Sequence, residues 1–326
     1  LSVGDAVEIY PIGRTARVRG LQSFGVSAEQ VNPGARCAVN LQGVELSDLS
    51  RGLVVSLPGA LQPTGALDAE ISLLPEAPAI TGPTSVEFLT GTSERRARLA
   101  PIGSDGIDPG KQSFVRIHLE EDPVALLPGD RFILRGFARL AGGGASVGGG
   151  SVLDVAPPHR RLNNPILVRE LAGLAAGDEE TAVEIRVKRT GFAGLSFESL
   201  VCETGIGKQE LRALLAERAA AGAVHEVSSG VWLGGEATLD LEERLLAALA
   251  AFHERERILP GMPRGALGGA LPENTAPGTF ELLLERLVAT NRIAVEQKLV
   301  RLPGHSPTLS EREKDVAARI LSLIHI

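Results

Sequence analysis

The first part of the chain alternates short apolar runs with clusters of glycine, proline, asparagine and aspartate. Runs of this length with apolar residues at alternate positions predict β-strands, and the turn residues between them predict tight connections. Over residues 1–60 the expected strands are 6–10, 15–21, 36–41 and 53–57. Because no helical pattern separates them, we expect a small closed β-barrel over this segment.

The same pattern continues over residues 61–158. Turn signals such as Asp108-Pro109-Gly110 again separate short apolar runs. The expected strands are 67–73, 85–89, 94–100, 113–119, 130–137 and 151–155. We therefore expect a second small antiparallel barrel after the first.

A glycine-rich stretch from Gly142 to Arg161 ends the strand pattern. It carries six glycines in nine residues, and Pro157-Pro158 follows. Glycine lets the backbone bend and approach other chains closely, whereas proline disfavours a helix before it. We predict a hinge here, with the last strand inside it and a domain boundary at residue 158.

Helical patterns follow the hinge. Asn164-Pro165 predicts a helix start, because asparagine caps helices and proline suits the first helical position. Further helices are expected over 178–189, 196–203 and 207–221, followed by a hairpin over 223–233. Helices that end in a small hairpin are typical of a winged helix-turn-helix, which we place over residues 159–235.

The helix over 208–221 is the one that such a module normally offers to nucleic acid. Glu210 and Glu217 lie among its basic residues, so an ordinary solvated helix face explains the pattern equally well. The basic residues that would form a nucleic-acid face are Lys208, Arg212 and Arg218.

This module is repeated along the chain. The sequence at 214–218 (LLAER) recurs at 282–286 as LLLER, and each copy leads into a hairpin. Self-similarity at one period indicates one domain type used repeatedly. We therefore expect a second winged helix over residues 236–304 and the start of a third over 305–326. The predicted class is a multidomain β plus α protein with two small antiparallel β-barrels followed by tandem winged-helix domains.

Composition narrows the possible roles. The net charge of −7 argues against a broad nucleic-acid-binding surface, so any such role must come from local clusters. Cys37 and Cys202 have no metal-ligand spacing and are expected to be thiols in a reducing compartment. No apolar run is long enough to span a membrane and no signal peptide opens the chain, so we expect a cytoplasmic protein. Because the first residue is Leu1, we interpret the chain as a piece of a longer protein.

No motif for catalysis, metal binding or nucleotide binding is complete. The Gly207-Lys208 pair could belong to a phosphate-binding loop, but Cys202 and Gln209 stand where the first glycine and the magnesium-binding hydroxyl are required. His253-Glu254 lacks the second histidine of a zinc protease, because Arg257 stands in its place. We expect no catalytic residue, metal site or cofactor in this chain.

Four blocks within residues 1–60 resemble domain II of the translational GTPases, the family of elongation factor Tu. They are Val3-Gly4-Asp5, RVRGLQ at 17–22, PGARCAVNLQGV at 33–44 and LSRG at 49–52. The segment DRFILRGFARLAGGGASVGGGSVLD at 130–154 and the segment over 252–267 resemble the selenocysteine-specific elongation factors.

This resemblance implies delivery of selenocysteinyl-tRNA to the ribosome at recoded UGA codons. It implies that the protein is a monomer. GTP and Mg²⁺ would bind an N-terminal GTPase domain outside this chain. Whether the chain is part of an enzyme therefore depends on that domain. The barrels would bind the tRNA, and further C-terminal modules would read an mRNA hairpin.

The resemblance also implies an aminoacyl-tRNA interface. Arg51 matches an arginine of the family's pocket for the aminoacyl end, where a guanidinium could favour an ionised selenol. A structural ion pair is the alternative role for this residue. The candidates for contacts with acceptor-stem phosphates, with the same alternative, are Arg135, Arg139, Arg160 and Arg161.

Two other classes of function stay open at this point. One is a winged-helix DNA-binding regulator with a β-barrel sensor half, which predicts a basic recognition helix and a two-fold dimer. The other is an adaptor whose helical repeats bind only protein. The acidic composition of the winged-helix segments argues against the DNA-binding regulator.

Overall fold

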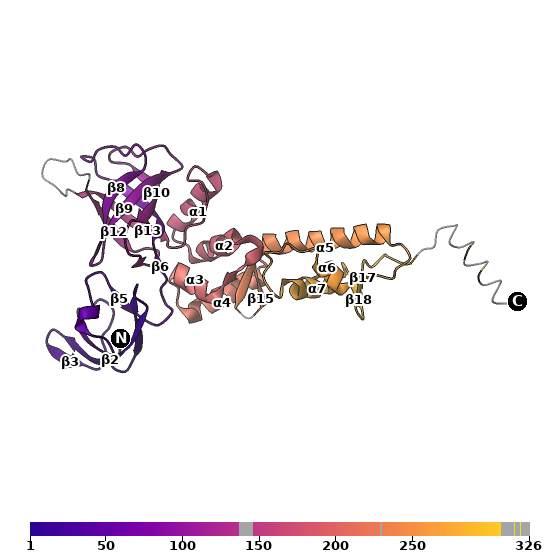
Figure 1. The fold of residues 1–326 in the computed structure, drawn as a ribbon, viewed down its shortest axis with the longest axis horizontal. Helices are drawn as coiled ribbons and strands as arrows, with labels where there is room; N and C mark the ends of the chain where they lie inside the picture. The colour runs from indigo at the N-terminus through magenta and orange to yellow at the C-terminus, as the bar shows by residue number, and fades with distance from the viewer. Residues whose placement is uncertain (137–145, 229, 308–315, 317–319, 321–326) are drawn as a thin grey trace. The chain divides into compact units, whose positions relative to one another are not determined.

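The fold is taken from a computed structural model that describes residues 1–136, 146–228, 230–307, 316 and 320. The chain divides into two compact units (Figure 1). Unit 1 comprises Leu1–Ile185 and Glu198–Leu214, and unit 2 comprises Arg186–Phe197 and Leu215–Ile326. The predicted third module begins at residue 305, and nearly all of it lies outside the described residues.

Unit 1 begins with a five-stranded antiparallel sheet. Apolar side chains alternate along its strands, so Val7, Ile9 and Val18 are buried on one face. The strands are β1 (Ala6–Tyr10), β2 (Arg14–Ser23), β3 (Val26–Ala28), β4 (Ala38–Gln42) and β5 (Val54–Ser56). β3 was not predicted, because Phe24 and Gly25 interrupt the apolar run before it.

This sheet differs from the closed barrel predicted for residues 1–60. Its order is β3-β2-β1-β5 with β4 also paired to β2, and in the described residues no ladder joins β5 to β3 or β4. The physical reason lies in the connection between β4 and β5, which forms the short 3-10 helix η1 (Leu46–Asp48) instead of a strand. β5 itself has only three residues, so it can pair along little of its length.

The second set of strands forms the predicted closed barrel. Its strand order is β10-β7-β13-β12-β8-β9, and pairing of β9 with β10 completes the ring. Leu67, Ala69 and Ile71 are fully buried in its core, where Phe88 and Phe132 have ring centroids 4.9 Å apart. The barrel strands are β7 (Ala66–Leu73), β8 (Thr84–Thr90), β9 (Ser93–Ile102), β10 (Gln112–Leu119), β12 (Arg131–Arg135) and β13 (Ser146–Asp154). A two-stranded ladder of β6 (Pro63–Thr64) and β11 (Val124–Ala125) lies outside this ring.

The glycine-rich stretch is partly a strand, which corrects the hinge predicted there. Gly148, Gly149 and Gly150 lie inside β13, between β7 and β12. An added Cβ would lie 2.5 Å from the Ser72 carbonyl oxygen at the first position and 2.6 Å from that of Phe132 at the second. At Gly150 it would lie 1.9 Å from the Glu70 carbonyl oxygen. The strand therefore fits only without side chains at these three positions.

A buried ion pair joins two barrel strands. Nε and Nη2 of Arg116 donate to the two carboxylate oxygens of Asp68 at 2.7 and 2.8 Å. Both side chains are almost fully removed from water. Removing one partner would leave the other charge buried, so the pair favours this strand register over others.

The first helix packs on the barrel. α1 (Pro165–Ala175) begins as predicted, with the Asn164 side chain accepting from the Ile166 N–H at 2.9 Å. Its buried face, which includes Leu167 and Leu171, shares a core with Ile102 and Leu153 of the barrel. Figure 1 shows α1 beside β13.

The remaining elements form two copies of one arrangement, as the repeat predicts. The first copy contains α2 (Glu179–Arg189), η2 (Gly191–Ala193), β14 (Leu195–Ser196), α3 (Phe197–Thr204), α4 (Lys208–Ala220), β15 (Val224–Ser228) and β16 (Val231–Gly234). The second contains α5 (Gly235–Arg255), β17 (Met262–Pro263), α6 (Arg264–Gly268), α7 (Thr279–Ala289), β18 (Ala294–Glu296) and β19 (Leu299–Arg301). The sheet orders β14-β16-β15 and β17-β19-β18 correspond strand by strand.

Unit 2 has one continuous core. Leu233, at the end of the first hairpin, packs in the same cluster as Leu241, Leu245 and Leu283 of the second copy. A backbone hydrogen bond also joins the two copies, because the Ala276 N–H before α7 donates to the Phe192 carbonyl of η2 at 2.9 Å. The first hairpin and the second winged helix are therefore packed as a single body.

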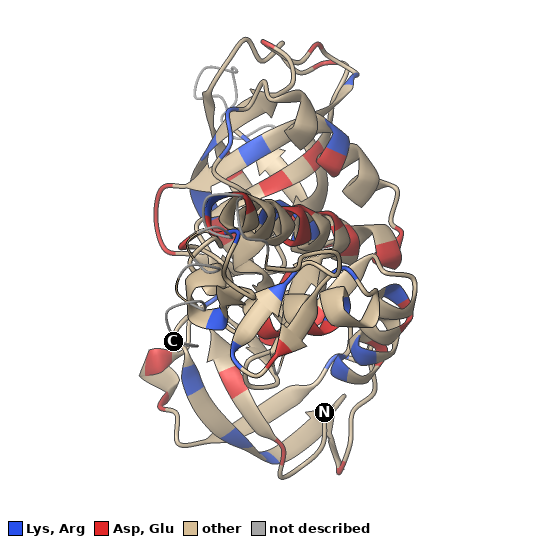
Figure 2. Cartoon of the chain, turned by 90° about the vertical axis from the view of Figure 1, so that its right-hand side faces the viewer, with Lys and Arg blue, Asp and Glu red and all other residues tan. Residues whose placement is uncertain are grey.

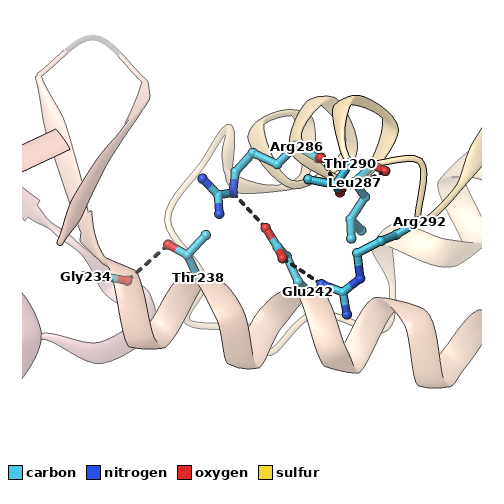
Figure 3. Close-up of polar contacts among 7 residues, drawn as sticks. All are labelled: Gly234, Thr238, Glu242, Arg286, Leu287, Thr290 and Arg292. Atoms are coloured by element: carbon cyan, nitrogen blue, oxygen red, sulfur yellow. Dashed lines mark hydrogen bonds and ion pairs between the residues drawn. The ribbon is translucent and has the colours of Figure 1, made fainter. Parts of the chain in front are cut away.

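A charged cluster on α5 holds α7 in place (Figure 3). Glu242 is almost fully buried, and its two carboxylate oxygens accept from Arg286 Nε at 2.7 Å and Arg292 Nη1 at 3.1 Å. The pKa of His225 on β15 is lowered, mainly by burial and next by the positive charge of Arg286. The negative charge of Glu242 acts in the opposite direction and offsets part of this lowering. The cluster thus connects α5, α7 and the start of the second hairpin.

Replacing Gly150 with alanine tests the steric requirement on β13. The new methyl group would overlap the Glu70 carbonyl oxygen, so we expect Gly150→Ala to destabilise unit 1 by about 1–3 kcal/mol or to prevent its folding. Gly65→Ala is the matched control, because no atom lies within 4 Å of its added Cβ. Urea unfolding, monitored by circular dichroism, measures the stability of both variants. Equal stability of the two variants would contradict the requirement.

Replacing Glu242 with glutamine tests the buried charge cluster. Two arginines would lose their countercharge, and because both are partly exposed we expect a loss of about 1–3 kcal/mol. Asp240→Asn removes the exposed ion pair with Arg244 and should change stability by less than about 0.5 kcal/mol. Fluorescence of Trp232, which lies in unit 2 and is the single tryptophan, reports urea unfolding. A cluster that contributes nothing would give the same midpoint for both variants.

Candidate nucleic-acid interface

Arg51 lies at a turn that is fixed against the barrel. The next residue, Gly52, has φ 94° and donates its N–H to the Thr92 hydroxyl of the β8–β9 turn at 2.9 Å. A Cβ on Gly52 would lie 3.0 Å from the Cβ of Ser93, so glycine is required there. Arg51 itself is exposed, and within the described part of the chain its side chain has no hydrogen-bond or ion-pair partner. Its charge is therefore available to a ligand.

Arg135 lies in a different environment. Its guanidinium donates to Glu87 at 2.7 Å and to Glu94 at 2.5 Å. The hydrogen bond and charge of Glu87, followed by the charge of Glu94, raise the pKa of Arg135 further above its usual value. Two carboxylates would compete with an RNA phosphate for this side chain.

The other predicted phosphate contacts also differ among themselves. Arg160 Nη1 donates to Glu170 of α1 at 2.7 Å, and both side chains are largely buried. Arg161 is exposed and has no side-chain partner among the described residues. Arg139 lies outside the described residues. Arg161 and Arg51 are thus the members of the predicted set whose charges are not neutralised within the described chain.

Helix α4 carries the three basic residues predicted for a winged-helix interface. Lys208 and Arg212 are exposed, whereas Arg218 is half-buried. Arg212 and Arg218 already have partners within the chain. In α7, Arg286 occupies the position that matches Arg218 in the repeat, and it is bound to Glu242. These partners reduce the basic charge that either helix can offer to nucleic acid.

A hollow that the sequence analysis did not identify lies at the β2–β3 turn. Its volume is about 350 Å³, and Phe24 at the turn is 88% exposed with φ 49°. The Ser23 hydroxyl donates to the Arg36 carbonyl at 3.2 Å, which joins the turn to the segment before β4. The lining residues are Gln22, Phe24, Gly25, Arg36, Cys37 and Ala38. An exposed ring beside a guanidinium can stack on an unpaired base and contact its phosphate.

A groove of about 760 Å³ runs over the outside of the barrel beside Gly150 of β13. Gly150 contributes no side chain to it, so the strand backbone stays accessible. Ser72, Gln112 and Arg131 are exposed along the groove and present a hydroxyl, an amide and a guanidinium. These are the groups with which proteins commonly contact phosphate and ribose oxygens.

A third hollow, a cavity of about 620 Å³, lies between the first sheet and the barrel within unit 1. Gly52, the neighbour of Arg51, lines it, and Gly91 and Arg131 line both this cavity and the barrel groove. This cavity and the barrel groove therefore adjoin. A ligand lying along the barrel groove would come close to the turn that carries Arg51.

The described residues hold no group of three or more histidine, cysteine, aspartate or glutamate side chains placed to bind a metal ion. Cys202 is buried with its Sγ near the Gly59 carbonyl at 3.5 Å, and burial raises the pKa of its thiol. Among the helices that the structure describes, none has the length and apolar character needed to cross a bilayer.

Comparison with known proteins agrees with the fold. The family model "Elongation factor SelB, winged helix" matches residues 246–302, which include the C-terminal part of α5, α6, α7 and the second hairpin. A selenocysteine-specific elongation factor from Desulfomicrobium baculatum is 29% identical over 314 residues, which is 95% of this chain and 48% of that protein.

A solved structure, the crystal structure of bacterial selenocysteine-specific elongation factor EF-Sec, aligns with 99% of this chain and 48% of its own length. Its TM-score is 0.62 at 20% identity, which supports the fold. The chain spans about half the length of these relatives. Along nearly its whole length, the chain is similar to the selenocysteine-specific elongation factors, as the sequence motifs predict.

Proposed function

We propose that this chain is part of an elongation factor that delivers selenocysteinyl-tRNA to the ribosome at recoded UGA codons. Unit 1 would bind the tRNA, and unit 2 would form an arm toward an mRNA hairpin. The observation that carries the proposal is the similarity to a selenocysteine-specific elongation factor over 95% of the chain. GTP and Mg²⁺ would bind another domain of that factor, which would act as a monomer in the cytoplasm.

The hollows of unit 1 support a role in binding tRNA. A tRNA ends in an unpaired strand, whose bases can stack on aromatic rings, and continues into an A-form stem that proteins contact through phosphate and ribose oxygens. The Phe24–Arg36 hollow suits the unpaired end. The barrel groove, with the exposed Gln112 and Arg131, suits the stem.

The charge distribution favours local contacts. Lys and Arg are interspersed with Asp and Glu along the cartoon in Figure 2, and the net charge is −7. A protein of this charge gains little from a general attraction to phosphates, so affinity would come from individually placed groups. Arg51, Arg36 and Arg131 are exposed residues of this kind.

Binding of the 326-residue chain to labelled tRNA tests the proposal. We expect it to bind charged selenocysteine tRNA more tightly than a DNA duplex of equal length, as measured by fluorescence anisotropy. Phe24→Ala should weaken tRNA binding by about 5- to 100-fold, because one base–aromatic stack contributes about 1–3 kcal/mol. Val26→Ala, a change at an exposed residue of β3 outside the hollow, should leave the affinity unchanged.

Equal affinity for duplex DNA would instead favour a DNA-binding regulator. Absence of binding to either nucleic acid would favour a protein-binding adaptor. Either result would contradict the proposal.

Arginine substitutions test which guanidinium groups contact RNA. Arg51→Gln removes a charge that has no partner in the described part of the chain and should reduce affinity for tRNA by about 5- to 20-fold at low salt, with a smaller dependence on salt concentration. Arg135→Gln removes a charge already neutralised by Glu87 and Glu94 and should change affinity less than about twofold. Anisotropy titrations at several salt concentrations measure both. A larger effect at Arg135 would reverse the assignment.

A further inference from the structure

Two histidine rings stack at the far end of the second winged helix. His253 lies in the last turn of α5 and is only 8% exposed. His305 follows β19 in the segment over residues 302–307, which we term the exit segment. The ring centroids are 3.6 Å apart and the ring planes differ by 9°. Residues 52 positions apart in the sequence are thus held face to face.

Hydrogen bonds attach the exit segment at Leu302 and at His305. The Leu302 N–H donates to His253 Nε2 at 3.2 Å. His305 Nε2 lies 2.8 Å from the Leu259 carbonyl oxygen, which can only accept, so this nitrogen carries a proton. The His305 N–H also donates to the Leu302 carbonyl at 3.0 Å and closes a turn between the two histidine contacts.

This arrangement requires a neutral His253. Its Nε2 accepts a hydrogen bond and therefore carries no proton, while its Nδ1 is buried without a hydrogen-bond partner in the described chain. Burial lowers the pKa of His253, and the neighbouring His305 lowers it further. Two positive rings at this separation would repel each other strongly.

The surrounding charges largely pair with one another. On α5 and the following loop, Arg255 donates to Glu256 at 3.1 Å, and Arg257 donates to the Glu254 carbonyl. On β19, Arg301 pairs with Glu296 at 2.6 Å. Beside burial, the charge of His305 is what lowers the pKa of His253.

We propose that His253 and His305 form a clamp that fixes the exit segment to the end of α5, and that protonation of the pair releases it. A closed clamp sets the direction in which the chain leaves the second winged helix. An open clamp lets this direction vary. The inference depends on these contacts alone and is independent of the proposed function.

The sign of the pH dependence follows from the lowered pKa. Because the folded state favours neutral His253, the clamp contributes fully above the unfolded-state pKa of about 6.5 and weakens as pH falls below it. The loss stops once the pH passes below the lowered pKa of the folded state. The clamp is therefore closed at neutral pH and opens in mild acid.

Hydrogen exchange of the Leu302 amide in the full chain measures the clamp directly. After correction for the intrinsic pH dependence of exchange, we expect its protection to be constant above about pH 7. Below about pH 6.5 it should fall by up to about tenfold per pH unit. His253→Phe keeps an aromatic ring but removes the acceptor, so the protection of this amide should be lost at every pH. His305→Phe keeps the stack but removes the charge that lowers the pKa of His253, so the fall should be smaller and should end at a higher pH.

The matched control is His118→Gln, which changes an exposed histidine on β10 and should alter nothing at Leu302. Protection that does not change between pH 5 and 8 would overturn the release by protonation. Protection that persists in His253→Phe would overturn the clamp itself.

Discussion

Strand β13 can lie between β7 and β12 only because three of its residues, Gly148, Gly149 and Gly150, carry no side chain. The carbonyl oxygens of Glu70, Ser72 and Phe132 occupy the positions that Cβ atoms would take at Gly150, Gly148 and Gly149. This steric constraint closes the barrel, because β13 supplies the link between two neighbouring strands. Gly150 also lines the groove on the outer wall, so the glycine that the fold requires there also leaves a candidate surface for RNA open.

The interface depends on which charges remain free after the chain has folded. Arg135 and Arg160 lie within ion pairs, whereas Arg51 lies beside Gly52 at a turn and has no ion-pair partner among the described residues. The hollow at Phe24 adds stacking to charge. Recognition by a protein of net negative charge is then a matter of a few positioned groups, which suits a ligand with a defined shape.

Local sequence patterns predicted most strands and helices, because apolar alternation, caps and turns are encoded within a few residues. They did not predict the pairing of glycines within β13, since three glycines carry no apolar signal and are typical of a loop. They also could not show that Arg135 would meet Glu87 and Glu94, which are 48 and 41 residues away in sequence. Phe24 was missed because an aromatic residue in an apolar pattern is ordinarily buried.

We propose that unit 1 binds tRNA through the Phe24 hollow and the barrel groove, and that α7 does not contact the tRNA. Hydrogen exchange of the full chain with and without charged selenocysteine tRNA tests this claim most directly. We expect added protection over residues 22–38 and 146–151, and none over Thr279–Ala289. Protection confined to the winged-helix segments, with unit 1 unchanged, would contradict it.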